Sequence, residues 1–219
     1  QTFGDPGNPA MLLIMGAMAS MLWWPEALCK KLVGEGRFVI RYDNRDTGLS
    51  TKYAPGEPPY SFEDMADDAV RVLDEYGIGR AHVAGMSMGG MIAQLMALKC
   101  PSRVNALTVI SASPLGVDTS HLPGATDAYR KHSAEGAKVD WADRDQVVGF
   151  IVSEARAIAS TAHPFDEERT RAFVEQDYDR SGGFLSTTNH FLLKGGDQER
   201  RVKDVKVPLL IIHGTADPI

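Results

Sequence analysis

The sequence predicts an α/β fold built on a doubly wound, mainly parallel sheet, and three observations lead to this prediction. Short apolar runs of strand length alternate with amphipathic segments of helix length through the first half of the chain. Several of these runs are apolar on both faces, as the interior strands of a parallel sheet are. The third observation is a Gly-x-Ser-x-Gly pattern, residues 85–89, placed between an apolar run and a helical segment.

The elements of the first half follow in order from apolar runs and turn residues. Residues 10–15 are a continuous apolar run that ends at Gly16, which predicts an interior strand. Pro25 suits the first turn of a helix, which we expect to end near Gly34. Residues 38–40 form the next apolar run, and the loop after it lies where open α/β sheets keep their sites.

A second helix is predicted from residue 61 to residue 76. Ser61 and Asp64 resemble a capping box in which Asp replaces the more common Glu, and Gly77 stops the helix. Two further strand and helix signals then follow, and a last apolar run lies close to residue 219. The five predicted strands begin at Ala10, Phe38, Ala81, Ala106 and Val207.

The pattern changes after residue 113. Residues 141–160 and 166–179 are patterned as polar amphipathic helices, and no clear strand lies between residues 114 and 196. We therefore expect a helical cap formed by residues 114–196. It interrupts an α/β core formed by residues 1–113 and 197–219.

Composition narrows the classes of partner. The chain is 43% hydrophobic and 24% charged, with a formal net charge of −6 and no basic run, which argues against nucleic acid or an anionic membrane surface. The apolar stretch 10–24 is too short to span a membrane and lacks a basic flank. Cys29 and Cys100 have no metal-ligand spacing, so they predict free thiols and a cytoplasmic setting.

The Gly-x-Ser-x-Gly pattern makes Ser87 the candidate nucleophile. Small residues at positions 85 and 89 allow a sharp turn that presents the serine hydroxyl, and the following helix directs its free N–H groups and positive dipole toward it. The alternative is a glycine-rich turn in which the Ser87 side chain caps the helix. A nucleophilic serine also needs a histidine and a carboxylate, and Asp217 follows the last strand at a suitable place.

These motifs together resemble the α/β-hydrolase family over nearly the whole chain. Residues 15–17 stand where that family often has a His-Gly oxyanion loop, and residues 43–50 stand where many members carry a D-x-R-G-x-G-x-S loop. The amino-acid sequence of residues 43–48, Asp-Asn-Arg-Asp-Thr-Gly, is most similar to that of the aclacinomycin methylesterase branch of serine carboxylesterases. The resemblance implies Ser87 as nucleophile, Asp217 as triad acid and the backbone N–H groups of Ala17 and Met88 as oxyanion hole, with no metal or organic cofactor.

Each of these roles has a structural alternative. Asp217 would also serve to close a turn with Pro218, and a small residue at position 17 would also allow close packing. For residues 43–50 the structural interpretation is favoured, with Arg45 and Asp46 bonding to neighbouring loops.

None of the six histidines stands where the resemblance places the catalytic histidine, and a substitute from the predicted cap is disfavoured because it would have to reach down to the serine oxygen. His82 and His213 lie inside predicted strands, and the other four lie in the predicted cap. The resemblance places this histidine after one further strand beyond the acid. We therefore expect it in an additional C-terminal segment that completes the site, and residues 1–6 resemble the tail of an opening hairpin.

The predicted function is hydrolysis of carboxylic esters by a serine hydrolase through an acyl-enzyme intermediate. Apolar residues near the oxyanion loop and a helical cap favour a small hydrophobic ester as substrate. Two alternatives stay open, a cofactor-free perhydrolase using the same triad and a non-catalytic ligand-binding protein on the same scaffold. The epoxide hydrolase and dehalogenase branches are disfavoured because they carry aspartate where this chain has Ser87.

Overall fold

A computed structural model describes residues 1–195 and 202–219, and it divides into two compact units. The first unit comprises Gln1–Val117 and Ser186–His213, and the second comprises Asp118–Leu185 and Gly214–Ile219. The predicted boundary between residues 196 and 197, where the cap was expected to end, lies outside the described residues.

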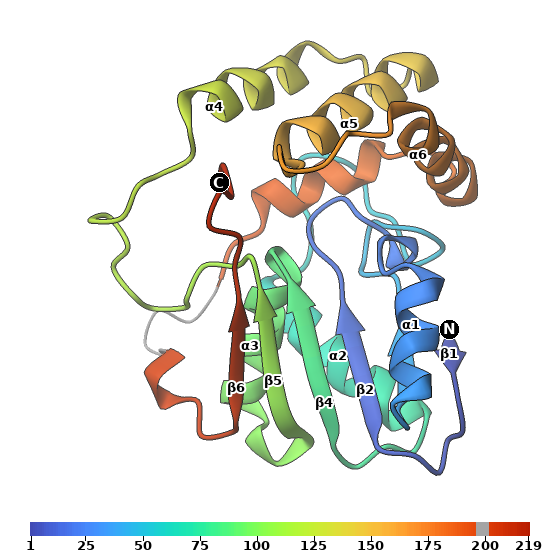
Figure 1. Ribbon diagram of the computed structural model, residues 1–219, viewed down its shortest axis with the longest axis vertical. Helices are drawn as coiled ribbons and strands as arrows, with labels where there is room; N and C mark the ends of the chain where they lie inside the picture. The colour runs from blue at the N-terminus through green and yellow to red at the C-terminus, as the bar shows by residue number, and fades with distance from the viewer. Residues whose placement is uncertain (196–201) are drawn as a thin grey trace. The chain divides into compact units, whose positions relative to one another are not determined.

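A mainly parallel sheet forms the centre of the first unit (Figure 1). Its described part has six strands in the order β1-β3-β2-β4-β5-β6, with β1 antiparallel to β3 and the other pairs parallel. This confirms the predicted fold class, but the expected number of five strands was one too low. The additional strand, β1, is only two residues long and lies within residues 1–6, which resemble the tail of an opening hairpin. The strands are β1 (Thr2–Phe3), β2 (Ala10–Ile14), β3 (Phe38–Arg41), β4 (Ala81–Met86), β5 (Val104–Ile110) and β6 (Leu209–Ile212).

The register of the two central strands brings the predicted site segments together. In the parallel pair of β2 and β4, Ile14 lies opposite Gly85. The chain that leaves β2 and the turn that leaves β4 therefore start side by side at the carboxyl edge of the sheet, where open α/β folds keep their sites.

Helices cover both faces of this sheet (Figure 1). The first unit contains α1 (Glu26–Gly34), α2 (Phe62–Glu75) and α3 (Met88–Lys99). Leu12 and Ile14 of β2 belong to the apolar cluster of α2 and α3, whereas Leu13 and Met15 pack with Cys29 of α1. This alternation along β2 is the two-residue period of a strand that is buried on both faces. Burial of each such leucine contributes roughly 1.5–3 kcal/mol to stability.

The predicted capping box at the start of α2 is confirmed. The Asp64 backbone N–H donates to Ser61 Oγ over 3.3 Å, and the Ser61 N–H donates to Asp64 Oδ2 over 2.8 Å. Aspartate is one methylene shorter than glutamate, yet it completes the reciprocal pair.

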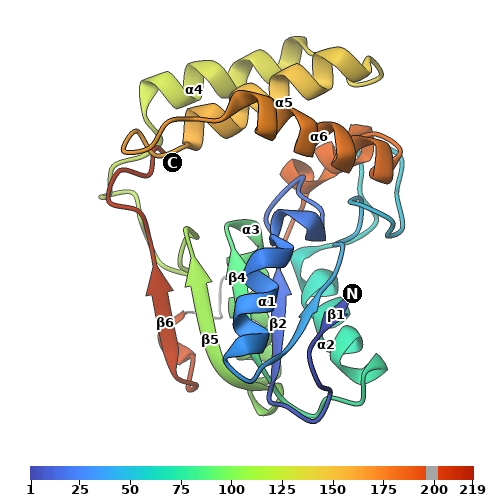
Figure 2. The same cartoon turned by 45° about the vertical axis from the view of Figure 1, so that its right-hand side comes forward.

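The second unit is helical in its described residues (Figure 2). Its helices are α4 (Asp127–Ala134), α5 (Arg144–Ile158) and α6 (Glu167–Ser181), capped by the side chains of Thr126, Asp143 and Asp166. The last two confirm the helices expected at residues 141–160 and 166–179. The sequence analysis missed α4, which is short and has no buried residue to produce an apolar stripe.

None of the helices in the described ranges is long and apolar enough to cross a membrane.

Candidate active site

The turn after β4 holds Ser87 in a conformation that few side chains adopt. Its φ is +52° and its ψ is −124°, and the residue is exposed. The Ser87 N–H donates to the Ile110 carbonyl of the neighbouring strand over 2.9 Å, which anchors the turn to the sheet. A non-glycine residue with positive φ at the carboxyl edge of a sheet is typical of a strained functional turn.

Two glycines make this turn sterically feasible. A Cβ atom at Gly85 would lie 2.1 Å from the Gly89 carbonyl oxygen, and one at Gly89 would lie 2.2 Å from the Ile14 carbonyl oxygen. Backbone atoms at these distances leave no space for any side chain. The Gly-x-Ser-x-Gly pattern is therefore a packing requirement at both glycines.

The Ser87 hydroxyl is not used to cap α3. The residue stands at the N-cap position, but its side chain makes no capping hydrogen bond. Its carbonyl instead accepts from the N–H groups of Gly90 and Met91, over 2.8 and 3.2 Å. Ser87 is therefore the N-cap residue by position, but its hydroxyl does not cap the helix.

The loop after β2 passes directly beside Ser87. A Cβ atom at Gly16 would lie 3.2 Å from Ser87 Cβ and 3.7 Å from Ser87 Oγ. Ala17 follows Gly16, and Met88, the first residue of α3, follows Ser87. The structure thus brings the predicted oxyanion segments and the predicted nucleophile to one place.

Residues 43–50 hold this loop from the outside. The Asn44 side-chain amide donates to the Met15 carbonyl over 3.0 Å. The Asp43 carboxylate accepts from the N–H groups of Met21, over 2.8 Å, and Leu49, over 3.0 Å. One carboxylate and one amide therefore connect residues 43–50 to both ends of segment 15–21.

His190 provides another connection to the same loop. Its Nδ1 accepts from the Met18 N–H over 3.0 Å, and its Nε2 lies 2.8 Å from the Arg45 carbonyl oxygen. A backbone N–H can only donate and a carbonyl can only accept, so the ring is neutral with its proton on Nε2. Burial agrees with this, because it lowers the pKa of His190 below the usual value for histidine.

The sequence analysis missed this role of His190. The residue was counted with the predicted cap, but it belongs to the first unit, in a 3-10 helix (η4, Leu185–Leu192). No periodicity or motif near residue 190 indicates a partner 172 positions earlier in the chain.

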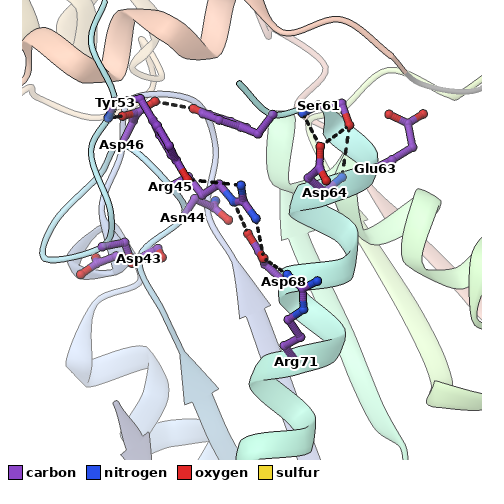
Figure 3. Close-up of polar contacts among 12 residues, drawn as sticks. Asp43, Asn44, Arg45, Asp46, Tyr53, Ser61, Glu63, Asp64, Asp68 and Arg71 are labelled. Carbon is purple, nitrogen blue, oxygen red and sulfur yellow. Dashed lines mark hydrogen bonds and ion pairs between the residues drawn. The ribbon is translucent and has the colours of Figure 1, made fainter. Parts of the chain in front are cut away.

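Arg45 and Asp46 are structural, as expected (Figure 3). The Arg45 guanidinium makes a bidentate contact with the Asp68 carboxylate of α2 at 2.6 and 3.0 Å, and it also donates to the Tyr53 hydroxyl of a neighbouring loop over 3.5 Å. The Asp46 carboxylate accepts from the Tyr53 N–H over 2.6 Å and from the Tyr60 hydroxyl over 2.5 Å. Together these contacts fix residues 43–50 to the body of the first unit.

Asp217 lies in the turn that follows β6 and belongs to the second unit. Its N–H donates to the Gly214 carbonyl over 3.3 Å, and its Oδ1 accepts from the Ile219 N–H over 3.2 Å. The side chain therefore contributes to a turn, and it is partly buried. Of the predicted site residues, Ser87, Ala17 and Met88 share the first unit, and Asp217 is described with the second.

Other histidines have their own contacts. His82 Nε2 lies 2.8 Å from Thr108 Oγ1, and burial lowers the pKa of this histidine. In the second unit the His132 ring stacks on Phe150 with ring centroids 5.6 Å apart. Among the described residues of the first unit, no hydrogen bond joins a histidine to the Ser87 hydroxyl.

A separate cavity of about 410 Å³ opens beside residues 42–53 and α2. Tyr42, Arg45 and Asp68 are among its lining residues, and Ser87, Ala17 and Met88 are not. It is thus distinct from the surroundings of the serine. The described residues also contain no cluster of three or more histidine, cysteine or acidic side chains suited to hold a metal ion.

Known proteins resemble both the sequence and the fold. A family model described as alpha/beta hydrolase fold matches residues 9–219. The rhodomycin D methylesterases DauP of Streptomyces sp. (strain C5) and DnrP of Streptomyces peucetius are each 46% identical over 115 residues, which is 52% of this chain. The matched part spans only 39% of the length of either relative. This similarity agrees with the predicted resemblance to a methylesterase branch.

Solved structures show the same architecture. The enol-lactonase from Burkholderia xenovorans LB400 superposes with a TM-score of 0.70 at 18% sequence identity, covering 98% of this chain and 76% of that one. At this level of identity the similarity demonstrates the fold alone.

Proposed function

Because the chain belongs to the alpha/beta hydrolase fold family, we propose that the protein is a serine hydrolase that cleaves carboxylic esters through an acyl-enzyme intermediate. The observation that carries the proposal is the exposed Ser87 on its strained turn, with no capping bond and with the Gly16 loop beside it. A serine held in this way is suited to attack a carbonyl group.

In the proposed reaction, Ser87 Oγ attacks the ester carbonyl while a histidine base takes its proton. The negative charge that develops on the carbonyl oxygen is stabilised by the N–H groups of Ala17 and Met88 and by the positive end of α3. The intermediate then collapses, the histidine returns the proton to the departing alcohol, and the acyl group stays on Ser87. Water, activated by the same base, hydrolyses the acyl-enzyme and restores the serine.

Asp217 is proposed as the carboxylate that orients the base. Its place after β6 agrees with the chain order of this triad class, in which the acid follows the serine. For the base we propose a histidine other than His82 and His190. His82 and His190 already use ring nitrogens in hydrogen bonds within the first unit.

The substrate is proposed to be a methyl ester of a hydrophobic small molecule. Similarity to two rhodomycin D methylesterases supports this class. Residues 15–18 are called the oxyanion segment here. Just after it, the side chains of Met21, Leu22 and Trp23 are half-buried and apolar, and they suit such a ligand. We further propose that α4, α5 and α6 form the cap enclosing the ester. The free thiols of Cys29 and Cys100 support a cytoplasmic setting.

A fluorophosphonate probe and a panel of methyl esters test the proposal on the full gene product. We expect covalent labelling and ester turnover that are both lost in Ser87→Ala and both retained in the matched control Ser61→Ala, which changes only the capping box of α2. Turnover that survives Ser87→Ala with an unchanged circular dichroism spectrum would contradict the proposed nucleophile.

A further inference from the structure

In the oxyanion segment, side-chain hydrogen bonds hold the two peptide groups on either side of the peptide group between Gly16 and Ala17. The Met15 carbonyl shares a peptide plane with the Gly16 N–H, and it accepts from the Asn44 amide over 3.0 Å. The Met18 N–H shares a plane with the Ala17 carbonyl, and it donates to His190 Nδ1 over 3.0 Å. Between these two fixed planes lies the peptide group that carries the Ala17 N–H.

We propose that Asn44 and His190 are positioning residues that orient the Ala17 N–H toward the oxyanion of the reaction. This inference rests on the proposed function, because it assigns these side chains a task in the same catalytic step. Neither side chain is proposed to touch the substrate.

The segment needs such support because its own residues do not fix it. Gly16 has no Cβ atom to restrict its backbone, and Met18 adopts a φ of +62°, which disfavours a side chain. Without external support, Gly16 and Met18, which flank Ala17, would allow the peptide plane that carries the Ala17 N–H to rotate. External hydrogen bonds therefore decide the direction of the Ala17 N–H.

Both supporting side chains are themselves firmly placed. Asn44 is 3% exposed and His190 is 4% exposed, so neither exchanges its partner for water easily. The second nitrogen of His190 donates to the Arg45 carbonyl, next in the chain to Asn44. The Arg45 side chain is bound to Asp68 of α2. The oxyanion segment is thus connected through His190 and Arg45 to helix α2.

Orientation of this kind matters because oxyanion donors act over short distances. Loss of one donor costs about 10²- to 10³-fold in kcat, and a displacement of about 1 Å costs about 10²-fold. A support that only positions the donor is expected to contribute less than the donor itself. We expect kcat to fall about 10- to 100-fold when either support is removed, with KM changed by about twofold at most.

The test compares Asn44→Ala and His190→Phe with a control from the neighbouring residue of η4. Asn189 is fully buried and bonds to Asp46, Ala54 and Gly56, but not to residues 15–18. Asn189→Ala therefore loses buried hydrogen bonds of a similar kind without touching the oxyanion segment. Ester kinetics of the full gene product should show the fall in kcat for the first two variants and not for the control.

Two further readouts separate positioning from general destabilisation. Binding of a trifluoromethyl ketone, which forms a tetrahedral oxyanion adduct with the serine, should weaken in parallel with kcat/KM. Amide hydrogen exchange over residues 15–21 should accelerate in Asn44→Ala and His190→Phe and stay unchanged in Asn189→Ala. His190→Asn keeps an acceptor near the Nδ1 position, so it should recover part of the lost kcat, and it also serves if His190→Phe does not fold.

The outcomes distinguish this inference from the proposed function. If Ser87→Ala abolishes turnover but Asn44→Ala and His190→Asn keep the kcat of Asn189→Ala, the positioning role is wrong and the hydrolase proposal stands. If Ser87→Ala keeps turnover, the hydrolase proposal itself fails. A fall in kcat with no change in ketone binding or in hydrogen exchange would also overturn the positioning role.

Discussion

The turn around Ser87 and the oxyanion segment around Ala17 lie side by side, but they are held by different means. The first is determined by its own glycines, because any Cβ at Gly85 or Gly89 would collide with backbone atoms. The second is determined by Asn44 and His190, which lie 29 and 172 positions away from their partners in the chain. One half of the site is thus marked by a short sequence motif, and the other half is held by side chains that belong to no such motif.

The serine turn and the oxyanion segment are therefore sensitive to different substitutions. The serine turn does not tolerate side chains at its two glycines, because an added Cβ would collide with backbone atoms. A segment held from outside depends on side chains that carry no motif of their own. The following predictions test this contrast, from the largest expected effect to the smallest.

The largest effect is expected for Ser87→Ala, which removes the nucleophile and leaves the backbone of the turn in place. By analogy with serine protease triads, kcat should fall on the order of 10⁶-fold. The unfolding midpoint in urea should change little, since the hydroxyl makes no capping bond. Steady-state kinetics and urea unfolding of the same preparation provide both measurements, and a large loss of stability would show that the hydroxyl has a structural partner.

Gly89→Ala is expected to disrupt the turn through sterics alone. The added Cβ would lie 2.2 Å from the Ile14 carbonyl oxygen, and overpacking of this kind costs about 1–3 kcal/mol or more in unfolding free energy. Activity should be lost together with stability, because Ile14 directly precedes the oxyanion segment. The measurement is chemical denaturation with ester turnover.

Gly149→Ala is the matched control for this substitution. Nothing lies within 4 Å of a Cβ at Gly149, which is inside α5. The change should therefore stabilise the protein by up to about 1 kcal/mol through helix propensity. Equal effects of the two alanines would contradict the steric explanation.

Tyr60→Phe tests whether the loss of a hydrogen bond to Asp46, in the middle of residues 43–50, affects the oxyanion segment. The Tyr60 hydroxyl donates to Asp46 over 2.5 Å, and the carboxylate keeps its bonds to Tyr53 and Asn189. We expect a loss of about 1–2 kcal/mol in unfolding free energy. The value of kcat should stay within about twofold of wild type, because Asn44 and His190 are untouched. A tenfold fall in kcat would show that the support extends beyond these two side chains.

The smallest effect is expected for Ser61→Ala, which removes one half of the capping box of α2. Loss of a serine N-cap typically costs about 1 kcal/mol, and a thermal melt is sufficient to measure it. The described hydrogen bonds of Ser61 go to Asp64 and Met65, and not to the serine turn or the oxyanion segment, so kcat should not change. A change in kcat would mean that the stability of α2 affects the geometry of the site.

The features that depend on neighbouring residues could be predicted from the amino-acid sequence. Alternating apolar runs indicated the long strands and the helices of the first unit, since burial on both faces requires apolar residues at successive positions. The serine turn and the capping box of Ser61 and Asp64 followed from short motifs, each contained within five consecutive residues. The family was also apparent from these motifs, and the match over residues 9–219 supports it.

The support of the oxyanion segment could not be predicted, because it depends on contacts that form in the folded chain. Strand β1 and helix α4 are too short for their periodicity to stand out, so their existence depends on what they pack against. His190 looks like any other histidine of a polar stretch until the fold brings it to the Met18 N–H and the Arg45 carbonyl. A buried polar contact between distant residues leaves no trace in local pattern, because its energy depends on geometry that forms only when the chain is folded.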